Sequence, residues 1–234
     1  MSDRETTQKG AIAVDTGFSL SELVDDLTPV NPLRIRDGMA VALTLTLFVG
    51  VGISFFLGLR NGLTSGRIET IYLMRLAALL LVGGVSGYAA MSMARPAIDA
   101  TRRATETVAW RAALGIAALF PLLALVNIFS DIPSADQLDR MLYTRTVARE
   151  CLTYSGISAL IVGSGIVLWL RRGAVTAPER AGWLVGLAAG GFGAAAYSIY
   201  CPINTVVYIG TWYTAAVVIS AIAGRLIVPQ LLRW

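Results

Sequence analysis

The sequence predicts an all-α, polytopic membrane protein with six transmembrane helices and a short N-terminal tail. The first observation is composition: 56% of the 234 residues are hydrophobic and 15% are charged, against roughly 45–50% apolar and about 25% charged in soluble domains. The second is that the apolar residues form long continuous stretches, each near the ~20 residues that cross a ~30 Å hydrocarbon layer. Continuous stretches also lack the alternation typical of a membrane β-barrel.

Six stretches are apolar enough to form transmembrane helices. In chain order they cover residues 38–59, 71–94, 109–129, 151–170, 181–200 and 205–228. The last two are separated only by Cys201-Pro202-Ile203-Asn204, where proline favours a turn over one continuous helix. The residues before the first stretch are polar and mixed in charge, so we expect a tail of residues 1–36 and a membrane domain of residues 37–234.

Arginine and lysine in the loops predict the orientation. With the N-terminus in the cytoplasm, the cytoplasmic segments hold most of the basic residues, which favours an N-in, C-in topology. This topology puts Cys151, at the start of the fourth stretch, and Cys201, at the end of the fifth, on the same non-cytoplasmic side. Arg75, Arg111 and Arg225 lie near stretch ends, where we expect their side chains to snorkel to the membrane surface.

The two cysteines are the clearest candidates for chemistry. Two thiols can bind a soft metal ion or cycle to a disulfide. Alternatively, they form a permanent structural disulfide on an oxidising side, or are inert small apolar residues. Asp136, Asp139 and Glu150 could add hard ligands near Cys151, but acids in such a loop are also typical of a solvated segment.

Aromatic residues gather around Cys201 in the sequence. They are Tyr197, Tyr200, Tyr208, Trp212 and Tyr213. One interpretation is an aromatic belt at the membrane interface. The other is a packed cap that holds Cys201 in place, with Pro202, Trp212 and Tyr213 as its immediate surroundings.

The tail contains a predicted short amphipathic helix. Ser19 and Glu22 form a capping-box signature, and Pro29 ends the helix. Apolar residues recur at helical spacing: Phe18, Leu20, Leu23, Val24 and Leu27. Because so short a helix is unstable alone in water, we expect it to fold against a soluble partner or the protein's own inner loops. The membrane surface is a third candidate, but its anionic lipids would repel the acidic polar face.

The fifth stretch carries Gly182, Gly186 and Gly190 at four-residue spacing. Small residues in this pattern let membrane helices approach closely, so we assign these glycines to helix packing.

Composition also excludes several functions. The chain has no histidine and two cysteines, which excludes Ser-His-Asp catalysis, His-ligated metals and zinc fingers built from one chain. No Asp or Glu lies near the middle of a stretch, which argues against a proton-coupled transporter. The net charge of +4 is better explained by basic residues that set the orientation of a membrane protein than by binding to nucleic acid.

Several short motifs are similar to those of a known family. They are Arg171-Arg172-Gly173-Ala174, Pro178, the Gly/Ala-rich helix, Cys201-Pro202, Trp212-Tyr213, Arg233-Trp234, Cys151 and the tail run Asp26-Leu27-Thr28-Pro29-Val30. Through these motifs, most of the chain resembles the NrsF family of membrane anti-sigma factors.

The resemblance implies a role at the bacterial inner membrane. A protein of this kind holds an extracytoplasmic-function sigma factor through its cytoplasmic tail, here residues 18–32, and releases it under heavy-metal or oxidative stress. Cys151 and Cys201 correspond to the sensing cysteines. A transient soft heavy-metal ion at these thiols is the only cofactor expected, and the partners are the sigma factor and the lipid bilayer, without direct contact with nucleic acid. Oligomeric state stays open.

Three other functions are compatible with the residues. A membrane thiol–disulfide oxidoreductase coupled to quinone would use the two thiols, although it would lack the usual Cys-x-x-Cys pair. A small transporter and a purely structural membrane subunit are the others.

Overall fold

The computed structural model describes residues 33–60, 66, 69–94, 100–130 and 145–232. The chain divides into two units, Met1–Pro32 and Leu33–Trp234, and every described residue belongs to the second. The predicted tail helix, with its residues from Phe18 to Pro29, therefore lies outside the described part. The described part is helical, without a strand.

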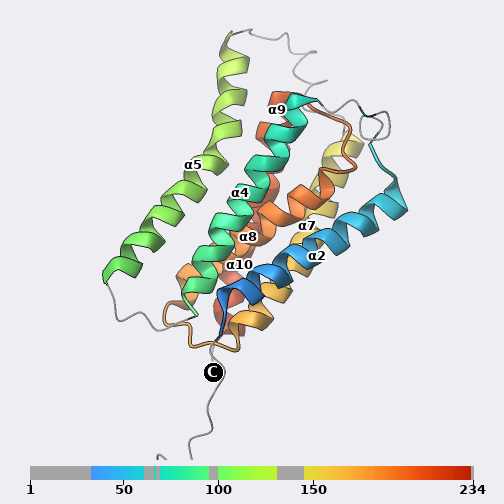
Figure 1. Ribbon diagram of the computed structural model, residues 1–234. Helices are drawn as coiled ribbons and strands as arrows, with labels where there is room; N and C mark the ends of the chain where they lie inside the picture. The colour runs from blue at the N-terminus through green and yellow to red at the C-terminus, as the bar shows by residue number, and fades with distance from the viewer. Residues whose placement is uncertain (1–32, 61–65, 67–68, 95–99, 131–144, 233–234) are drawn as a thin grey trace, which may run out of the picture. The chain divides into compact units, whose positions relative to one another are not determined.

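A helix occupies each of the six predicted stretches (Figure 1). The helices are α2 (Ile35–Leu57), α4 (Thr70–Ser92), α5 (Ala100–Ser130), α7 (Arg145–Leu170), α8 (Pro178–Tyr197) and a C-terminal helix made of α9 (Val206–Tyr208), η1 (Ile209–Tyr213) and α10 (Thr214–Leu231). Five of them, all except α8, contain a segment long and apolar enough to cross a membrane. The all-α fold with several candidate membrane spans is thus confirmed for the described residues, while the sixth span and the orientation stay predictions.

Helix α8 forms the centre of the bundle. It is buried along nearly its whole length and packs against α10, α7 and α4. Its glycine- and alanine-rich sequence contains no segment apolar enough to be a candidate span, unlike the sequences of α4, α7 and α10, which expose larger hydrophobic side chains. A helix covered by protein does not need a strongly apolar surface, because it is not exposed to lipid.

Glycines let α8 approach its neighbours on three sides. Towards α10, an added Cβ on Gly182 would lie 2.7 Å from the Gly224 carbonyl oxygen, one on Gly190 would lie 3.0 Å from the Val217 Cα, and one on Gly186 would contact the Ser220 carbonyl oxygen. Towards α4 and α7, added Cβ atoms would meet backbone at 2.7 Å from Gly191 and at 2.6 Å from Gly193. These distances leave no room for a methyl group, so backbone packs on backbone.

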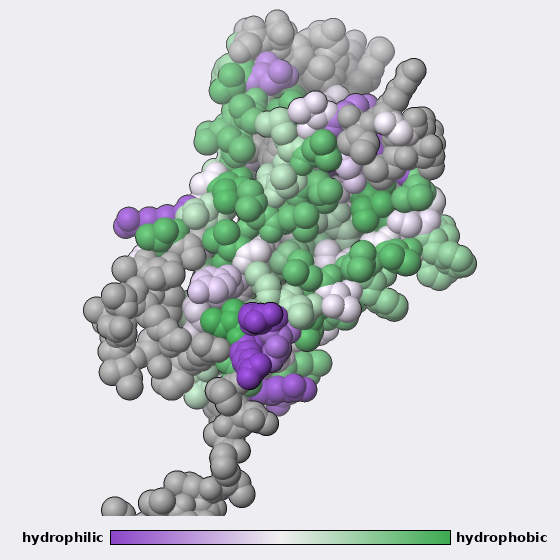
Figure 2. Space-filling view, in the orientation of Figure 1, coloured by the Kyte–Doolittle hydropathy of each residue, from purple (hydrophilic) through white to green (hydrophobic). Residues whose placement is uncertain are grey.

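Large hydrophobic side chains cover the outside of the bundle. Phe55 and Phe56 of α2 are 82% and 85% exposed, and similar residues line the outer faces of α5 and α10. Figure 2 shows hydrophobic surface over the middle of the helices in this view, with the strongly hydrophilic residues nearer their ends. Such a surface fits a lipid environment, because a soluble monomer rarely exposes apolar patches this extensive.

The C-terminal helix contains one turn of π-helix, η1. In a regular α-helix, residues five apart point about 140° from one another, since each residue turns about 100°. The wider π-turn brings Tyr208 and Tyr213 towards the same buried cluster, with ring centroids 6.5 Å apart. Single π-turns of this kind occur frequently at functional sites.

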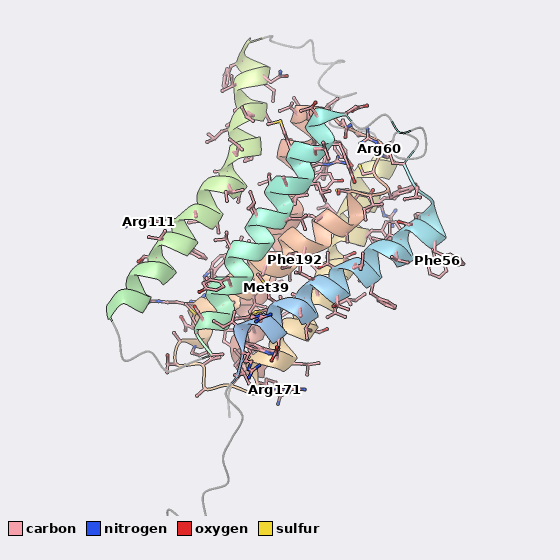
Figure 3. All side chains as sticks on the ribbon, viewed as in Figure 1. Met39, Phe56, Arg60, Arg111, Arg171 and Phe192 are labelled. Atoms are coloured by element: carbon pink, nitrogen blue, oxygen red, sulfur yellow. The ribbon has the colours of Figure 1, made fainter. Side chains whose placement is uncertain are left out.

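The segment that follows α8 forms the Cys201 loop, defined here as residues 198–204. It begins with hydrogen-bonded turns in which the Tyr200 and Cys201 amides donate to the Tyr197 carbonyl oxygen. Arg60, which contacts this loop, and Arg171 lie at opposite ends of the bundle (Figure 3). The loop therefore marks one end of the helix bundle.

Candidate functional site

Cys151 and Cys201 meet in one buried cluster. Cys151 lies in the second turn of α7, and Cys201 lies in the loop after α8. Both are free thiols with 0% exposure. The Cys151 thiol lies next to the Tyr208 hydroxyl, and Cys201 lies next to Tyr213. The tertiary structure thus brings together two thiols that are fifty positions apart in the sequence.

Three tyrosines form a packed cap over the cysteines. Tyr197, Tyr208 and Tyr213 are buried in the same cluster. The Tyr197 ring stacks on Tyr154 at 6.1 Å and lies 6.3 Å from Tyr213. The belt interpretation is therefore wrong for these three side chains, because a belt residue would face the membrane interface.

The remaining aromatic and proline positions are less enclosed. Trp212 and Tyr200 are half-buried against the cluster, and Pro202 is exposed at the tip of the loop. Of the three residues expected around Cys201, only Tyr213 is fully enclosed.

Arg75 is a candidate site residue that the sequence did not reveal. The expectation that it snorkels is wrong: its side chain has 0% exposure and points into the bundle from the second turn of α4. Its guanidinium donates to the carbonyl oxygens of Ile203 at 2.8 Å and Ser198 at 3.3 Å. The charged carbon Cζ lies 4.8 Å from the Tyr213 ring centroid, within cation–π range.

The expectation for Arg75 was wrong because it was based on the position of the residue in one helix, without the neighbouring helices. Near the start of α4, the C-terminal end of α8 and the Cys201 loop offer unpaired carbonyl oxygens. These oxygens satisfy the guanidinium inside the protein, so it does not need to reach water. The other two arginines are less buried: Arg111 is exposed, and Arg225 forms an ion pair with Glu179 at 2.6 Å.

A second arginine holds the outer edge of the same loop. Arg60 donates to the Asn204 side-chain oxygen at 2.7 Å and forms an ion pair with Glu69 at 3.3 Å. Its backbone amide donates to the Ile199 carbonyl oxygen at 3.4 Å. Asn204 in turn donates its side-chain amide to the Glu69 carboxylate. The loop is thus fixed at both ends by partners outside its own helix.

Electrostatics favour this outer network. The hydrogen bond from Asn204, followed by the charge of Arg60, lowers the pKa of Glu69 below its ordinary value of 4.5. Glu69 stays ionised at neutral pH, and its side chain is 57% exposed. Its contribution to stability is therefore small, because water screens an exposed ion pair.

The cluster contains more polar atoms than the described residues satisfy. Within the described part, Arg75 Nε and the Tyr197 hydroxyl have no hydrogen-bond partner, and the Ser155 and Tyr213 hydroxyls have none apart from the thiols of Cys151 and Cys201. Such unpaired buried groups are rare in proteins and call for an explanation. They show that the surroundings of the thiols are polar, unlike those of a cysteine packed as a small apolar residue.

The donor set limits what the site can bind. Among the described residues, no group of three or more Cys, Asp or Glu side chains could hold a metal ion. Glu150 is half-buried beside Cys151, while positions 136 and 139 lie outside the described part. Two thiols alone could bind a soft ion or form a disulfide, so the described donors fit transient chemistry better than a permanent metal centre.

The fold and this site define a class: a helical membrane protein with a buried thiol pair at one end of its bundle. Residues 23–234 match the sequence model of the NrsF family, described as the negative regulator of sigma F. The chain therefore belongs to this family, whose members are regulators rather than enzymes. The resemblance seen in the short motifs is confirmed.

Two curated relatives are similar to the chain. The anti-sigma-F factor NrsF of Caulobacter vibrioides (strain NA1000 / CB15N) is 32% identical over 123 residues, which cover 50% of this chain and 56% of the relative. The probable anti-sigma-F factor NrsF of Azospira oryzae (strain ATCC BAA-33 / DSM 13638 / PS) is 30% identical over 86 residues, or 37% and 40% of the two chains. The matches thus span about half the length of these relatives. No solved structure matches the chain.

Proposed function

We propose that the protein is an anti-sigma factor of the bacterial inner membrane. It holds an extracytoplasmic-function sigma factor through its N-terminal segment and releases it when Cys151 and Cys201 react with a heavy metal or an oxidant. The observation that carries this proposal is the family match over residues 23–234. The names of the two relatives, both anti-sigma-F factors, support the same function.

The N-terminal segment is the proposed binding element for two reasons. The family match begins at residue 23 and so includes the end of the amphipathic segment. The apolar residues Leu23, Val24 and Leu27 recur at helical spacing, which suits a helix laid into a groove of a soluble partner. Anionic lipid would repel the acidic face of the same helix, which favours a protein partner over the membrane surface.

The proposed topology has six spans with both termini in the cytoplasm. Five helices have the length and composition of spans. Helix α8 is the sixth, because it runs between α7 and α10 and is enclosed by helices that have those properties. The N-in orientation then puts the Cys201 loop on the side where an external signal arrives.

Two reactions could join the thiols. A soft divalent ion binds both sulfurs and displaces their two protons. Alternatively, a peroxide takes two electrons and two protons from the thiols, which become a disulfide while the peroxide O–O bond is reduced to water and an alcohol or a second water. Either reaction changes the packing between the start of α7 and the end of α8. If the sigma factor binds the protein with unreacted thiols a few kcal/mol more tightly than the protein with reacted thiols, the reaction suffices to release it.

Co-purification tests the binding half. Full-length protein, a variant lacking residues 1–15 and a variant lacking residues 16–32 serve as baits from native membranes under reducing conditions. We expect mass spectrometry to find a sigma factor with the first two baits and not with the third. The shorter deletion is the matched control, because it leaves the family-matched residues intact.

The same assay tests the sensing half. After exposure to Cd²⁺ under reducing conditions, or to hydrogen peroxide, wild-type protein should lose the sigma factor, whereas Cys151→Ser and Cys201→Ser should retain it. The two reagents distinguish metal binding from oxidation. Absence of any sigma factor on the full-length bait would overturn the proposal, and equal release from all three proteins would overturn its sensing half.

A further inference from the structure

Both cysteines are inaccessible in this structure, so any external signal requires part of the bundle to open. The short Cys201 loop is the natural place, because loops open locally at lower free energy than packed helices. What holds this loop closed therefore controls access to the thiols.

The inner contacts of the loop come from Arg75. Its two donated hydrogen bonds, to Ser198 and Ile203, span the loop from its first residue to its last but one. The same guanidinium packs over the ring of Tyr213, the neighbour of Cys201. Hydrogen bonds from a charged donor are stronger than neutral ones, and an ionisable residue inside a membrane span is by default a candidate functional residue.

The outer contacts come from Arg60. Its backbone amide and guanidinium bind Ile199 and Asn204, again near the two ends of the loop. The ring of Tyr72 links the two arginines, with Cζ of Arg60 at 5.3 Å and Cζ of Arg75 at 5.5 Å from its centroid. Neither arginine belongs to α8 or to the helix after the loop, so their contacts tie the loop to the segment that precedes α4 and to α4 itself.

We infer that Arg60 and Arg75 act as a two-arginine clamp that holds the Cys201 loop shut and sets how readily the thiols react. They are positioning residues: each acts on Cys201 through loop carbonyl oxygens or a side chain of the loop. This inference deepens the proposed function by naming what regulates access to its sensor. Opening of the clamp frees the end of α8 and exposes the sulfur atoms.

Thiol labelling of the purified full-length protein tests the clamp without a sigma factor. In a Cys151→Ser background, Cys201 is the single cysteine, and its rate of reaction with N-ethylmaleimide at fixed pH is followed by mass. We expect Arg75→Met to raise this rate about tenfold or more, because two charge-assisted hydrogen bonds are lost. Arg75→Lys should restore part of the protection, since lysine keeps a donor and the charge.

A second variant keeps the test independent of folding defects in the core. Asn204→Ala removes the side chain that binds both Arg60 and Glu69, at a half-buried position of the loop. We expect it to accelerate labelling of Cys201 by a smaller factor than Arg75→Met.

The charge that Arg75→Met removes does not account for faster labelling. Loss of a positive charge would by itself slow the reaction with N-ethylmaleimide, because the thiolate is the nucleophile. Faster labelling of Arg75→Met therefore reports opening of the loop.

Two controls separate the clamp from general loosening. Arg225→Gln breaks the Arg225–Glu179 ion pair, which lies away from the loop, and should leave the labelling rate of Cys201 unchanged. Ser86→Cys, placed in a chain without the native cysteines, reports on a fully buried position in α4 and should stay protected when Arg75→Met is added.

The labelling results test the clamp and not the binding of a sigma factor. If Arg75→Met and Asn204→Ala leave the labelling rate of Cys201 at the value of the Cys151→Ser parent, or if the Ser86→Cys reporter becomes reactive to the same extent, the clamp is overturned. Either result would leave the co-purification test untouched, and loss of sigma-factor binding in that test would not affect labelling. The two proposals can therefore fail separately.

Discussion

Arg75 carries a positive charge into the interior of an apolar helix bundle. An isolated charge there would be strongly destabilising, but the carbonyl oxygens of Ser198 and Ile203 and two tyrosine rings surround the guanidinium. Removing these partners would leave a buried unpaired charge. The destabilisation from such a charge is much larger than the net stabilisation that the paired contacts provide. At this scale, the site consists of two thiols, three tyrosines and the arginine that fixes the loop around them.

Glu69 gives the clamp a dependence on pH. Its pKa is lowered in the folded protein, so its stabilising contribution is complete above its ordinary value of 4.5 and disappears as the pH falls through the lower, folded value. We expect Glu69→Gln to lower the thermal unfolding midpoint slightly at about pH 7, and we expect this difference to shrink as the pH is lowered below 4.5. Thermal unfolding in mild detergent over a series of pH values measures this. A difference that stays the same size throughout the series would show that the charge of Glu69 is not the cause.

At the scale of elements, α8 organises the bundle because it lacks side-chain bulk. Its glycines face α10, α4 and α7, so three neighbours approach its backbone closely. Close backbone contact gives a large area of van der Waals packing, which is the main attraction between helices in lipid. We therefore expect a displacement at the Cys201 end of this helix to be transmitted along it, because densely packed interfaces do not deform gradually.

Gly186→Ala should destabilise the bundle. A methyl group at this position would contact the Ser220 carbonyl oxygen and lie 2.7 Å from the Ala221 Cα, and overpacking of this kind costs about 1–3 kcal/mol. Gly156→Ala in α7 is the matched control, because nothing lies within 4 Å of its added Cβ; there we expect no loss, or a gain of up to about 1 kcal/mol. Unfolding free energies in detergent compare the two. Equal effects would contradict the close-packing argument.

At the scale of the whole molecule, the topology depends on whether α8 crosses the membrane. If α8 crosses the membrane with the five candidate spans, the count is even and both termini lie on one side. If it does not cross, the count is odd and the termini lie on opposite sides. The proposed function needs the first arrangement, with the tail in the cytoplasm and the Cys201 loop outside.

Reporter fusions measure this directly. We expect a fluorescent protein to be fluorescent, and alkaline phosphatase to be inactive, when each is fused at either terminus of the chain, because both termini are proposed to lie in the cytoplasm. A phosphatase fusion within the Cys201 loop should be active. An active phosphatase at the C-terminus, with a fluorescent N-terminal fusion, would rule out the six-span topology.

The class of fold and the family could both be predicted from the amino-acid sequence. Continuous apolar stretches are a property of local composition, so the helices and their approximate ends could be predicted from them. The motifs around Cys151, Cys201-Pro202 and Trp212-Tyr213 led to the family for the same reason, since they can be recognised without knowing what they contact.

The surroundings of the two thiols could not be predicted in this way, because they depend on how the helices pack. The inward direction of Arg75, the π-turn that brings Tyr208 and Tyr213 together, and the contacts of Arg60 with the Cys201 loop depend on helices distant in the sequence. Residues as far apart as Arg75 and Ile203 come together only when α4 packs on α8, and no periodicity in the chain encodes that contact. Hydropathy places an arginine near a helix end, but whether it reaches water or a buried carbonyl oxygen depends on which partner the fold puts nearer.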